Sequence, residues 1–284
     1  MNYRHAYHAG GFTDVLKHAV LTRLVLYLER KPAPIFVLDT HAGLGRYDLA
    51  GPEATRTHEA DAGIHRLMAR RDVPEFIVPY LDRVRNLQTP GEALQHYPGS
   101  PRLIRDLLRR GDRLFAVEKH PEDVLALRRE FARDRQTRVF ALDGYEALGS
   151  FVPPRERRGL VLIDPAYEAE DETERLCAAL RTALRQWADG LYAVWYPIKE
   201  PAQVRALHAA VRDDPNVRRA LVVDLELAKP DGETLVGCGL VIINPPYVLP
   251  EELDAFMPYL ATILARERPA RWQRQWLRQE QPPD

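Results

Sequence analysis

The amino-acid sequence predicts an α/β fold, with a seven-stranded, mostly parallel sheet and helices on both of its faces. Short apolar runs typical of buried strands alternate with segments of helical periodicity six or seven times along the chain. The runs are continuous, as in 160–163 (Leu-Val-Leu-Ile), which indicates burial on both faces of a parallel sheet. Near the end of the chain, an Asp-Gly pair between two such runs predicts a hairpin, and therefore one antiparallel strand.

The composition is that of a soluble globular protein, since 45% of the 284 residues are hydrophobic and 29% are charged. The formal net charge of −1 excludes a polycation, so any contact with nucleic acid has to come from a local basic face. Cys177 and Cys238 lie far apart and are expected to be small core residues in a reducing compartment. The polar N-terminus and the lack of a long apolar run predict a cytoplasmic protein.

The chain is expected to begin with an arm and a long helix. Residues 1–12 are rich in aromatic residues and histidine and show no periodicity. Thr13 or Asp14 can cap a helix that runs to about Glu29 and carries an apolar stripe. Lys17 lies near the start of this helix, where the macrodipole disfavours a cation, so a functional lysine and a solvated one are both open.

A strand at 35–38 leads into a loop of small residues at 39–46, whose backbone can approach a ligand closely. The following stretch is polar and interrupted by prolines, and we interpret it as a small helical subdomain inserted into the main fold. The expected division is a main domain of 1–46 and 97–284 with an insertion at 47–96.

The remaining elements follow in regular alternation. Ser100 and Pro101 provide an N-cap and a first-turn proline for a helix that Gly111 ends. Lys-Pro-Asp-Gly at 229–232 is the expected turn of the closing hairpin, and an Arg-, Gln- and Pro-rich tail follows the last helix. The further strands are expected at 113–117, 138–142, 160–163, 191–196, 221–227 and 235–243. The further helices are expected at 60–70, 74–87, 121–134, 172–187, 202–213 and 251–265.

Acidic residues end four of the predicted parallel strands: Asp39, Glu118, Asp143 and Asp164. Because the carboxyl ends of parallel strands share one edge of a sheet, these carboxylates are expected to converge on one crevice, where open α/β sheets bind ligands. Glu118 is placed to accept hydrogen bonds from ribose hydroxyls, and Asp143 with Gly144 is placed to meet a purine edge. Strand ends are often polar, so one such carboxylate alone would predict little.

The strand at 160–163 ends in Asp164-Pro165-Ala166-Tyr167. Pro165 forbids both a further ladder bond and a helical conformation at Asp164, so a carboxylate, a proline carbonyl and an aromatic ring lie together at the strand end. The plain alternative is a strand that ends in a turn, with Asp164 in solvent and Tyr167 packed. The other strand-end carboxylates favour the functional interpretation.

Four histidines lie early in the chain: His5, His8, His18 and His41. No cysteine accompanies them and no familiar ligand spacing links them, so no metal site is predicted.

Five motifs are spread along the chain. They are Tyr-Arg-His-x-Tyr-His-Ala-Gly at 3–10, Asp-Val-Leu-Lys-His at 14–18, Leu-Asp-Thr-His-Ala-Gly-x-Gly-Arg-Tyr at 38–47, Tyr-Pro-Gly-Ser-Pro at 97–101 and Leu-Ile-Asp-Pro at 162–165. Together they resemble the RlmJ family of bacterial 23S ribosomal RNA adenine-N6 methyltransferases, over essentially the whole chain. The resemblance implies a Rossmann-like class I methyltransferase fold with S-adenosylmethionine as its cofactor.

The resemblance also implies roles for individual residues. Asp164, Pro165 and Tyr167 match the catalytic motif. The arm would close over the active site, so Tyr3 and His5 join Tyr167 as substrate-binding candidates. The residues that match the family's cofactor site are Lys17, His18, His41, Ser100, Glu118, Asp143, Gly144 and Asp164.

One departure from the family pattern concerns the catalytic motif, which is Asp-Pro-Pro-Tyr in the family. Ala166 replaces its second proline, which frees φ at that position and removes the bias of Pro165 toward an extended conformation. We expect a looser loop with unchanged chemistry. The Asn-Pro-Pro-Tyr sequence at 244–247 looks like a better amino-methyltransferase motif, but it follows the last strand, away from the crevice. Chain order therefore favours Asp164.

The expected reaction is direct methyl transfer to the N6 of an adenine. Asp164 and the Pro165 carbonyl would bind the two amino protons and draw the nitrogen toward a tetrahedral geometry, and Asp164 could take up the proton released. Tyr167 would stack on a base taken out of its helix.

Two alternatives stay open: guanine-N2 methylation, and a non-catalytic RNA-binding protein that keeps the cofactor fold, with Ala166 as a sign of decay. The expected partner is 23S ribosomal RNA, protein-free or in an early assembly intermediate, bound by a monomer. Arginines are candidates for phosphate contacts without further distinction: Arg4, Arg46, Arg56 and Arg102.

Overall fold

Eight strands form one sheet at the centre of the fold in the computed structural model, which describes residues 4–228, 235–265 and 269–279. They are β1 (Phe36–Asp39), β4 (Arg113–Val117), β5 (Thr137–Phe140), β6 (Gly159–Ile163), β7 (Leu191–Pro197), β8 (Ala220–Glu226), β9 (Gly237–Ile243) and β10 (Arg271–Arg278). Their order is β10-β8-β9-β7-β6-β1-β4-β5.

The strand order reverses direction at β1. From β1 the chain moves outward to β4 and β5, then returns to the other side of β1 with β6 and β7, and these five strands are parallel. The switch point therefore lies between β1 and β6. In open α/β sheets the crevice beyond the carboxyl ends at such a point is where ligands bind.

The predicted α/β class is confirmed, with one correction at the far end of the sheet. β8 and β9 pair antiparallel as expected, although their predicted turn at 229–232 lies outside the described residues. The sheet has eight strands where seven were predicted, because β10 forms in the tail and pairs antiparallel with β8. Its signal was a period of two in which Trp272 and Trp276 pack against the core.

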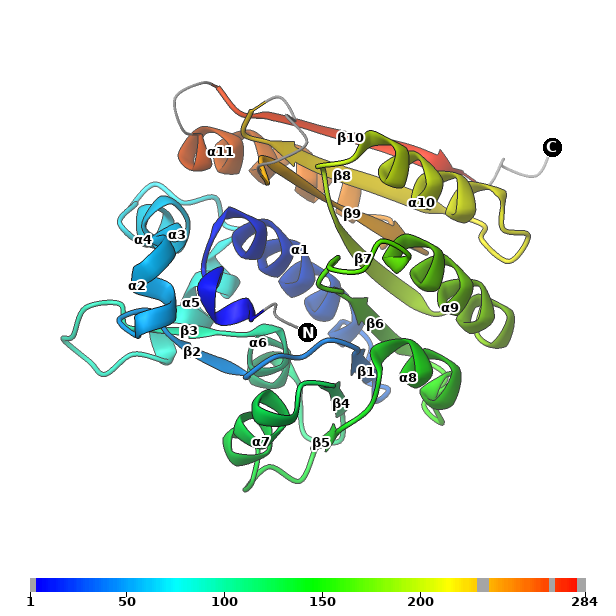
Figure 1. Ribbon diagram of the computed structural model, residues 1–284, viewed down its shortest axis with the longest axis horizontal. Helices are drawn as coiled ribbons and strands as arrows, with labels where there is room; N and C mark the ends of the chain where they lie inside the picture. The colour runs from blue at the N-terminus through cyan, green and yellow to red at the C-terminus, as the bar shows by residue number, and fades with distance from the viewer. Residues whose placement is uncertain (1–3, 229–234, 266–268, 280–284) are drawn as a thin grey trace.

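Helices cover both faces of the sheet (Figure 1). One face is covered by α8 (Gly144–Phe151), α9 (Glu172–Gln186) and α10 (Pro201–Asp213). The other is covered by α1 (Phe12–Glu29), α6 (Ser100–Leu107), α7 (Pro121–Glu130) and α11 (Leu249–Leu264). A 3-10 turn, η1 (His5–Tyr7), precedes α1.

Residues 47–96 contribute four short helices: α2 (Pro52–Thr57), α3 (Glu59–Ala62), α4 (Ile64–Met68) and α5 (Val78–Asn86). A two-stranded ladder of β2 (Arg46–Asp48) with β3 (His96–Pro98) brings the two ends of this stretch together. The single helix expected at 60–70 is broken at Gly63, whose backbone is not helical (φ −108°, ψ −106°), and a Cβ there would lie 2.1 Å from the Gly10 carbonyl oxygen. The break lets the Ile64 amide donate to that oxygen (2.8 Å), which ties the arm to the helices.

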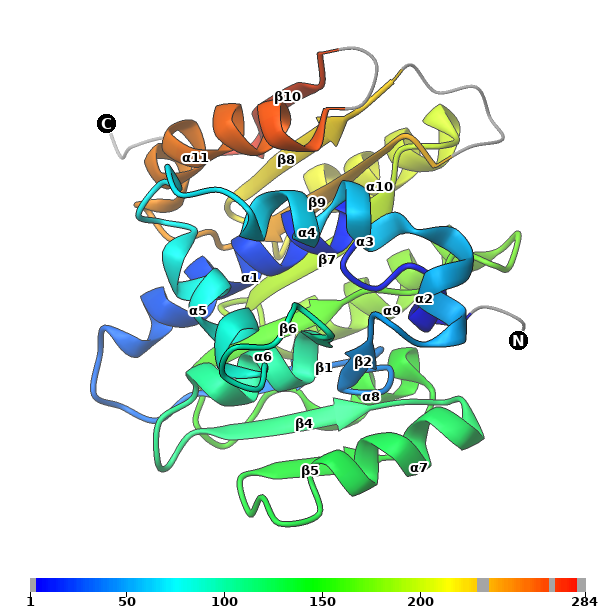
Figure 2. The ribbon, with the colours of Figure 1, turned by 90° about the vertical axis from the view of Figure 1, so that its left-hand side faces the viewer.

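α1 is buried around most of its circumference, so its apolar surface is not limited to the single stripe expected. It packs against the sheet on one side and against α5 and α11 on others (Figure 2). This position holds the side chains of its first turns rigidly at the carboxyl edge of the sheet.

Two predicted helix caps are wrong. Gly11 is the N-cap of α1, and the Asp14 carboxylate accepts instead from the Gly10 amide (3.0 Å). Gly99 is the N-cap of α6, and the Ser100 hydroxyl donates to Asp39 Oδ2 (2.6 Å). In both cases the polar side chain serves the crevice and not its own helix.

Candidate active site

A cavity of about 240 Å³ opens at the carboxyl edge of the sheet, at the switch point between β1 and β6. The side chains that line it include nine of the predicted site residues: His5, Lys17, His18, His41, Ser100, Glu118, Asp143, Gly144 and Asp164. Pro165 and Tyr167 do not line it. Tyr3 lies outside the described residues.

Lys17 lies in the cavity wall between two carboxylates. Its buried ammonium forms ion pairs with Asp14 Oδ1 (2.9 Å) and with Asp164 Oδ2. Burial alone would lower the pKa of Lys17, but the two carboxylates outweigh it and raise the pKa well above the ordinary value. Lys17 is therefore a fixed cation that orients Asp164, and not the solvated lysine that the sequence left open.

Asp14 connects the arm to this ion pair. It is fully buried, and its second oxygen, Oδ2, accepts from His5 Nε2 (3.0 Å) and from the Gly10 amide. Burial would raise the pKa of Asp14, but His5 and Lys17 lower it well below its usual range. The arm, α1 and the end of β6 thus share one hydrogen-bonded network at the cavity.

The two acidic residues predicted to meet the nucleoside part of a ligand lie on the other wall. Burial raises the pKa of Glu118, which accepts from the amides of Gly43 (2.8 Å) and His120 (2.7 Å). Burial acts in the same direction on Asp143, but Lys119 (2.8 Å) and other partners reverse it and lower its pKa. Asp143 is thus a carboxylate and Glu118 a weaker acid beside it.

His41 is neutral because burial lowers its pKa. Thr40 Oγ1 lies 3.0 Å from the Leu162 carbonyl oxygen and 2.8 Å from His41 Nδ1. These contacts hold the His41 ring in the cavity wall.

Gly144 begins α8 beneath the His41 ring, and only a hydrogen fits there. A Cβ at Gly144 would lie 2.4 Å from the Thr40 carbonyl oxygen and 2.7 Å from His41 Cε1. We expect Gly144→Ala to destabilise the protein by about 1–3 kcal/mol through overpacking, and to weaken cofactor binding because His41 must move. Urea unfolding and calorimetric titration with S-adenosylmethionine measure the two effects.

Gly149→Ala is the matched control, because Gly149 lies in the same helix with no atom within 4 Å of its Cβ position. Helix propensity predicts a gain of about 0.5–1 kcal/mol there, with unchanged cofactor affinity. Equal behaviour of the two variants would contradict a steric role for Gly144.

His18 offers a vacant hydrogen-bonding atom to a ligand. Burial lowers its pKa to about 3, so the ring is neutral. Nδ1 contacts the Tyr97 hydroxyl (2.7 Å), whereas Nε2 is buried without a partner among the described residues. An unpaired buried nitrogen in the cavity wall, together with Glu118, Asp143 and the close approach at Gly144, fits a ligand with an amino-acid end and a nucleoside end.

Asp39 ends β1 behind the Ser100 hydroxyl, and burial raises its pKa to about 7. A carboxylic acid whose pKa is higher in the folded than in the unfolded protein stabilises the fold fully at pH values below its unfolded pKa. This stabilisation is lost as the pH rises through the folded pKa. We therefore expect Asp39→Asn to gain stability over the wild type between pH 4 and pH 8, by up to about 4 kcal/mol.

Urea unfolding of both proteins across this range is the measurement. Ser100→Ala removes a hydrogen bond that lowers the pKa of Asp39. In this variant the loss of stability on ionisation of Asp39 should therefore extend to higher pH. A stability difference between wild type and Asp39→Asn that does not vary with pH would contradict the assignment.

Tyr167 is turned away from the cavity. Its φ is +53°, its hydroxyl donates to the Trp195 carbonyl (3.0 Å), and its ring meets that of Trp195 edge-on at 5.8 Å. Stacking of Tyr167 on a substrate base stays a prediction and requires the ring to leave Trp195.

The Asn-Pro-Pro-Tyr sequence lies at the opposite edge of the sheet. β9 runs antiparallel to β7, so Asn244 follows the end of β9 beside the start of β7. Its side-chain amide donates to the carbonyls of Ala188 and Gly190, both at 2.7 Å. Asn244 therefore closes a loop far from the cavity.

Sequence reasoning missed Glu172 and Arg175 in the cavity wall, and Asp14, which is buried behind Lys17. Asp14 had a usable signal, because it precedes Lys17 by three residues and so shares its helix face. Glu172 and Arg175 of α9 had none. They reach the cavity because the Tyr145 hydroxyl donates to Glu172 (2.5 Å), and Arg175 lies over the Tyr145 ring and reaches Asp143 (3.2 Å).

In the part of the chain that the structure describes, no group of three or more His, Cys, Asp or Glu side chains could hold a metal ion. Within the same residues, none of the helices has the length and apolar character that a bilayer crossing requires.

The switch-point crevice, its strand-end carboxylates and the Asp-Pro motif define a Rossmann-like class I methyltransferase that uses S-adenosylmethionine. A family model described as ribosomal RNA large subunit methyltransferase D, RlmJ, matches residues 32–278. This chain belongs to the RlmJ family.

Individual relatives agree along nearly the whole chain. Ribosomal RNA large subunit methyltransferase J of Haemophilus influenzae is 36% identical over 99% of this chain and 100% of its own length. Its Escherichia coli counterpart is 37% identical over 93% of this chain and 94% of its own. A crystal structure of a Legionella pneumophila protein is 33% identical, with a TM-score of 0.87 over 94% of this chain and 98% of that one.

Proposed function

We propose that this protein transfers the methyl group of S-adenosylmethionine to the exocyclic N6 of an adenine in 23S ribosomal RNA. The observation that carries the proposal is the Asp164 carboxylate, which is held by Lys17 at the end of β6 in the switch-point cavity of an RlmJ-family chain. When bound, S-adenosylmethionine supplies an electrophilic methyl group.

Asp164 and Pro165 would prepare the nitrogen for attack. Lys17 occupies Oδ2 of Asp164 and leaves Oδ1 to accept one N–H of the amine, while the Pro165 carbonyl accepts the other. Two acceptors draw the lone pair out of conjugation with the ring. The proton released after transfer passes to Asp164 Oδ1, and a weak base suffices because the methylated nitrogen is strongly acidic.

The cavity residues would hold the cofactor by both ends. Lys17, His18, His41 and Ser100 are assigned to the amino-acid end and the sulfonium, and Glu118, Asp143 and Gly144 to the nucleoside end. Tyr3 and His5 of the arm, with Tyr167, are assigned to the substrate base.

The remaining assignments follow the same proposal. The main domain comprises 1–46 and 97–284, and 47–96 form an insertion that supports the arm. The enzyme acts in the cytoplasm as a monomer, on RNA that is protein-free or part of an early assembly intermediate.

The test uses labelled S-adenosylmethionine, protein-free 23S ribosomal RNA and digestion to nucleosides. The expected product is N6-methyladenosine. Label on guanosine would reject adenine as the target, and binding of the cofactor without transfer would support a non-catalytic RNA-binding protein.

A further inference from the structure

The arginines around the cavity are largely neutralised by carboxylates. Arg4 pairs with Glu122, and Arg46 lies 3.6 Å from Glu130. Arg102, another candidate for phosphate contacts, pairs with Glu130 at 2.7 Å. The insertion does not attract RNA by its net charge either, because residues 47–96 contain six arginines and eight acidic residues. RNA therefore has to find its electrostatic attraction elsewhere on the molecule.

A group of exposed arginines without a carboxylate partner lies at the β5 end of the sheet. None of its members forms an ion pair with any residue that the structure describes. We call this surface the β5 margin. It consists of Arg110, Arg128, Arg129, Arg133, Arg135 and Arg138.

Acidic residues of the same stretch turn inward and do not neutralise the margin. The Glu130 side chain is 13% exposed and pairs with Arg102, and the Asp134 side chain is 19% exposed and pairs with Arg105 at 2.5 Å. The arginines next to them in sequence remain in solvent. The exposed charges of the margin are therefore all positive, although the formal net charge of the whole chain is −1.

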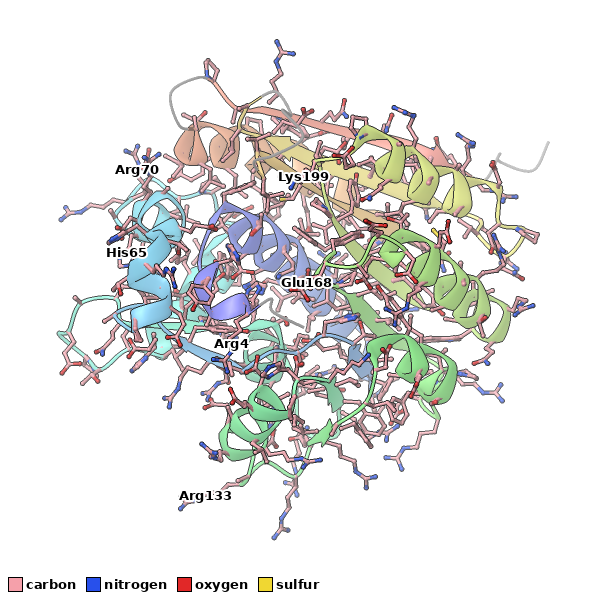
Figure 3. All side chains as sticks on the ribbon, viewed as in Figure 1. Arg4, His65, Arg70, Arg133, Glu168 and Lys199 are labelled. Carbon is pink, nitrogen blue, oxygen red and sulfur yellow. The ribbon has the colours of Figure 1, made fainter. Side chains whose placement is uncertain are left out.

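The margin comes from three segments that meet at the β5 end of the sheet. β5 is the last strand of the sheet and carries Arg138, and α7 and the following loop carry the arginines between 128 and 135. Gln136 joins this loop to the α6–β4 loop by donating to the carbonyls of Arg109 (2.7 Å) and Asp112 (2.8 Å), which brings Arg110 alongside. Figure 3 shows Arg133 projecting outward at this end of the molecule.

Most of the margin lies at the starts of β4 and β5, on the opposite edge of the sheet from the cavity, and α7 connects the two edges. α7 begins directly after Lys119 and His120, which line the cavity, and its ten residues span about 15 Å. A nucleic-acid duplex carries a charge about every 1.7 Å along its axis, so even a short hairpin crosses this distance with many phosphates.

The macrodipole of α7 accounts for the position of only two of the arginines in the margin. Arg128 and Arg129 lie in the last turn of α7, where the macrodipole favours cations. Arg133, Arg135 and Arg138 lie beyond the helix and gain nothing from it. Without a counter-charge, their proximity is unfavourable.

We propose that the β5 margin binds the phosphate backbone of the substrate RNA, independently of base sequence, and holds it while the target base enters the cavity. The inference rests on the proposed function for the identity of the RNA, but its chemistry is that of any RNA backbone.

The test is the triple variant Arg133→Gln, Arg135→Gln, Arg138→Gln. At about 0.15 M salt we expect KM for 23S RNA fragments to rise roughly ten- to a hundredfold, with kcat at saturating RNA unchanged. The slope of log affinity against log salt, from fluorescence anisotropy, should fall by about 2–3. Affinity for S-adenosylmethionine should not change, which checks the fold.

The matched control is Arg181→Gln, Arg185→Gln, Arg205→Gln, three exposed arginines of α9 and α10 that also lack a carboxylate partner among the described residues. It removes the same charge from elsewhere on the sheet and should leave KM and the salt slope nearly unchanged. Equal losses in both triples, an unchanged KM in the first, or a lower kcat in place of a higher KM would each overturn the inference. Anisotropy needs no turnover, so the margin remains testable even if the wild type methylates no adenine and the proposed function fails.

Discussion

Replacing Asp164 by asparagine is expected to lower kcat for methyl transfer by roughly 10²–10⁴-fold while the protein stays folded. Asparagine keeps the shape of the side chain but cannot take up the proton released from N6. Its amide also replaces one of the two carboxylate oxygens that accept hydrogen bonds from Lys17 and from the target amine. Single-turnover transfer to 23S RNA measures the loss. Thermal melting and calorimetric titration with S-adenosylmethionine check fold and cofactor affinity.

Asn244→Ala is the control for this experiment. It removes two hydrogen bonds from a loop at the opposite edge of the sheet, so we expect lower stability with normal activity per folded molecule. Full activity of Asp164→Asn together with an inactive Asn244→Ala would relocate the chemistry to the Asn-Pro-Pro-Tyr sequence.

Lys17→Met is expected to produce the largest loss of stability among these single changes, about 3–5 kcal/mol at pH 7. Methionine fills a similar volume but leaves Asp14 fully buried and Asp164 largely buried without their shared cation. Urea unfolding at several pH values is the measurement.

The pH dependence of this loss has a definite sign. In the wild type the pKa of Asp14 is depressed, so its contribution is present above the ordinary pKa of 3.8 and is lost as the pH falls through the depressed value. The gap between wild type and Lys17→Met should therefore be full at neutral pH and narrow in acid. Lys119→Met is the control, because its ion pair with Asp143 is 60% exposed on the lysine side and should contribute at most about 1 kcal/mol.

The sheet and the position of its crevice could be predicted because they follow from local patterns. Continuous apolar runs mark β1, β4 and β6 within one residue. Glu118 and Asp164, which follow β4 and β6, line the crevice because parallel strands share a carboxyl edge, whereas Asp39 of β1 is buried behind Ser100. Chain order alone placed Asn244 at the other edge.

Features that depend on tertiary contacts could not be predicted. Asp14 and Ser100 have the residue types of helix caps, but His5 of the arm and the buried Asp39 of β1 take their side chains. Tyr167 packs on Trp195, 28 residues later, and no pattern near the Asp-Pro motif indicates this. The helix break at Gly63 occurs where the arm passes, and the Gly10 carbonyl there accepts from the Ile64 amide.

The outermost strands of the sheet also bear on behaviour at high concentration. β5 and β10 each present a row of backbone groups that could template addition of a strand from another molecule. β5 spans only four residues and carries Arg138, and β10 carries Arg271 and Arg278 besides Arg274, which pairs with Asp254. Like charges on both rims oppose such polymerisation, and because salt screens that repulsion, concentrated stocks should resist aggregation best at low ionic strength.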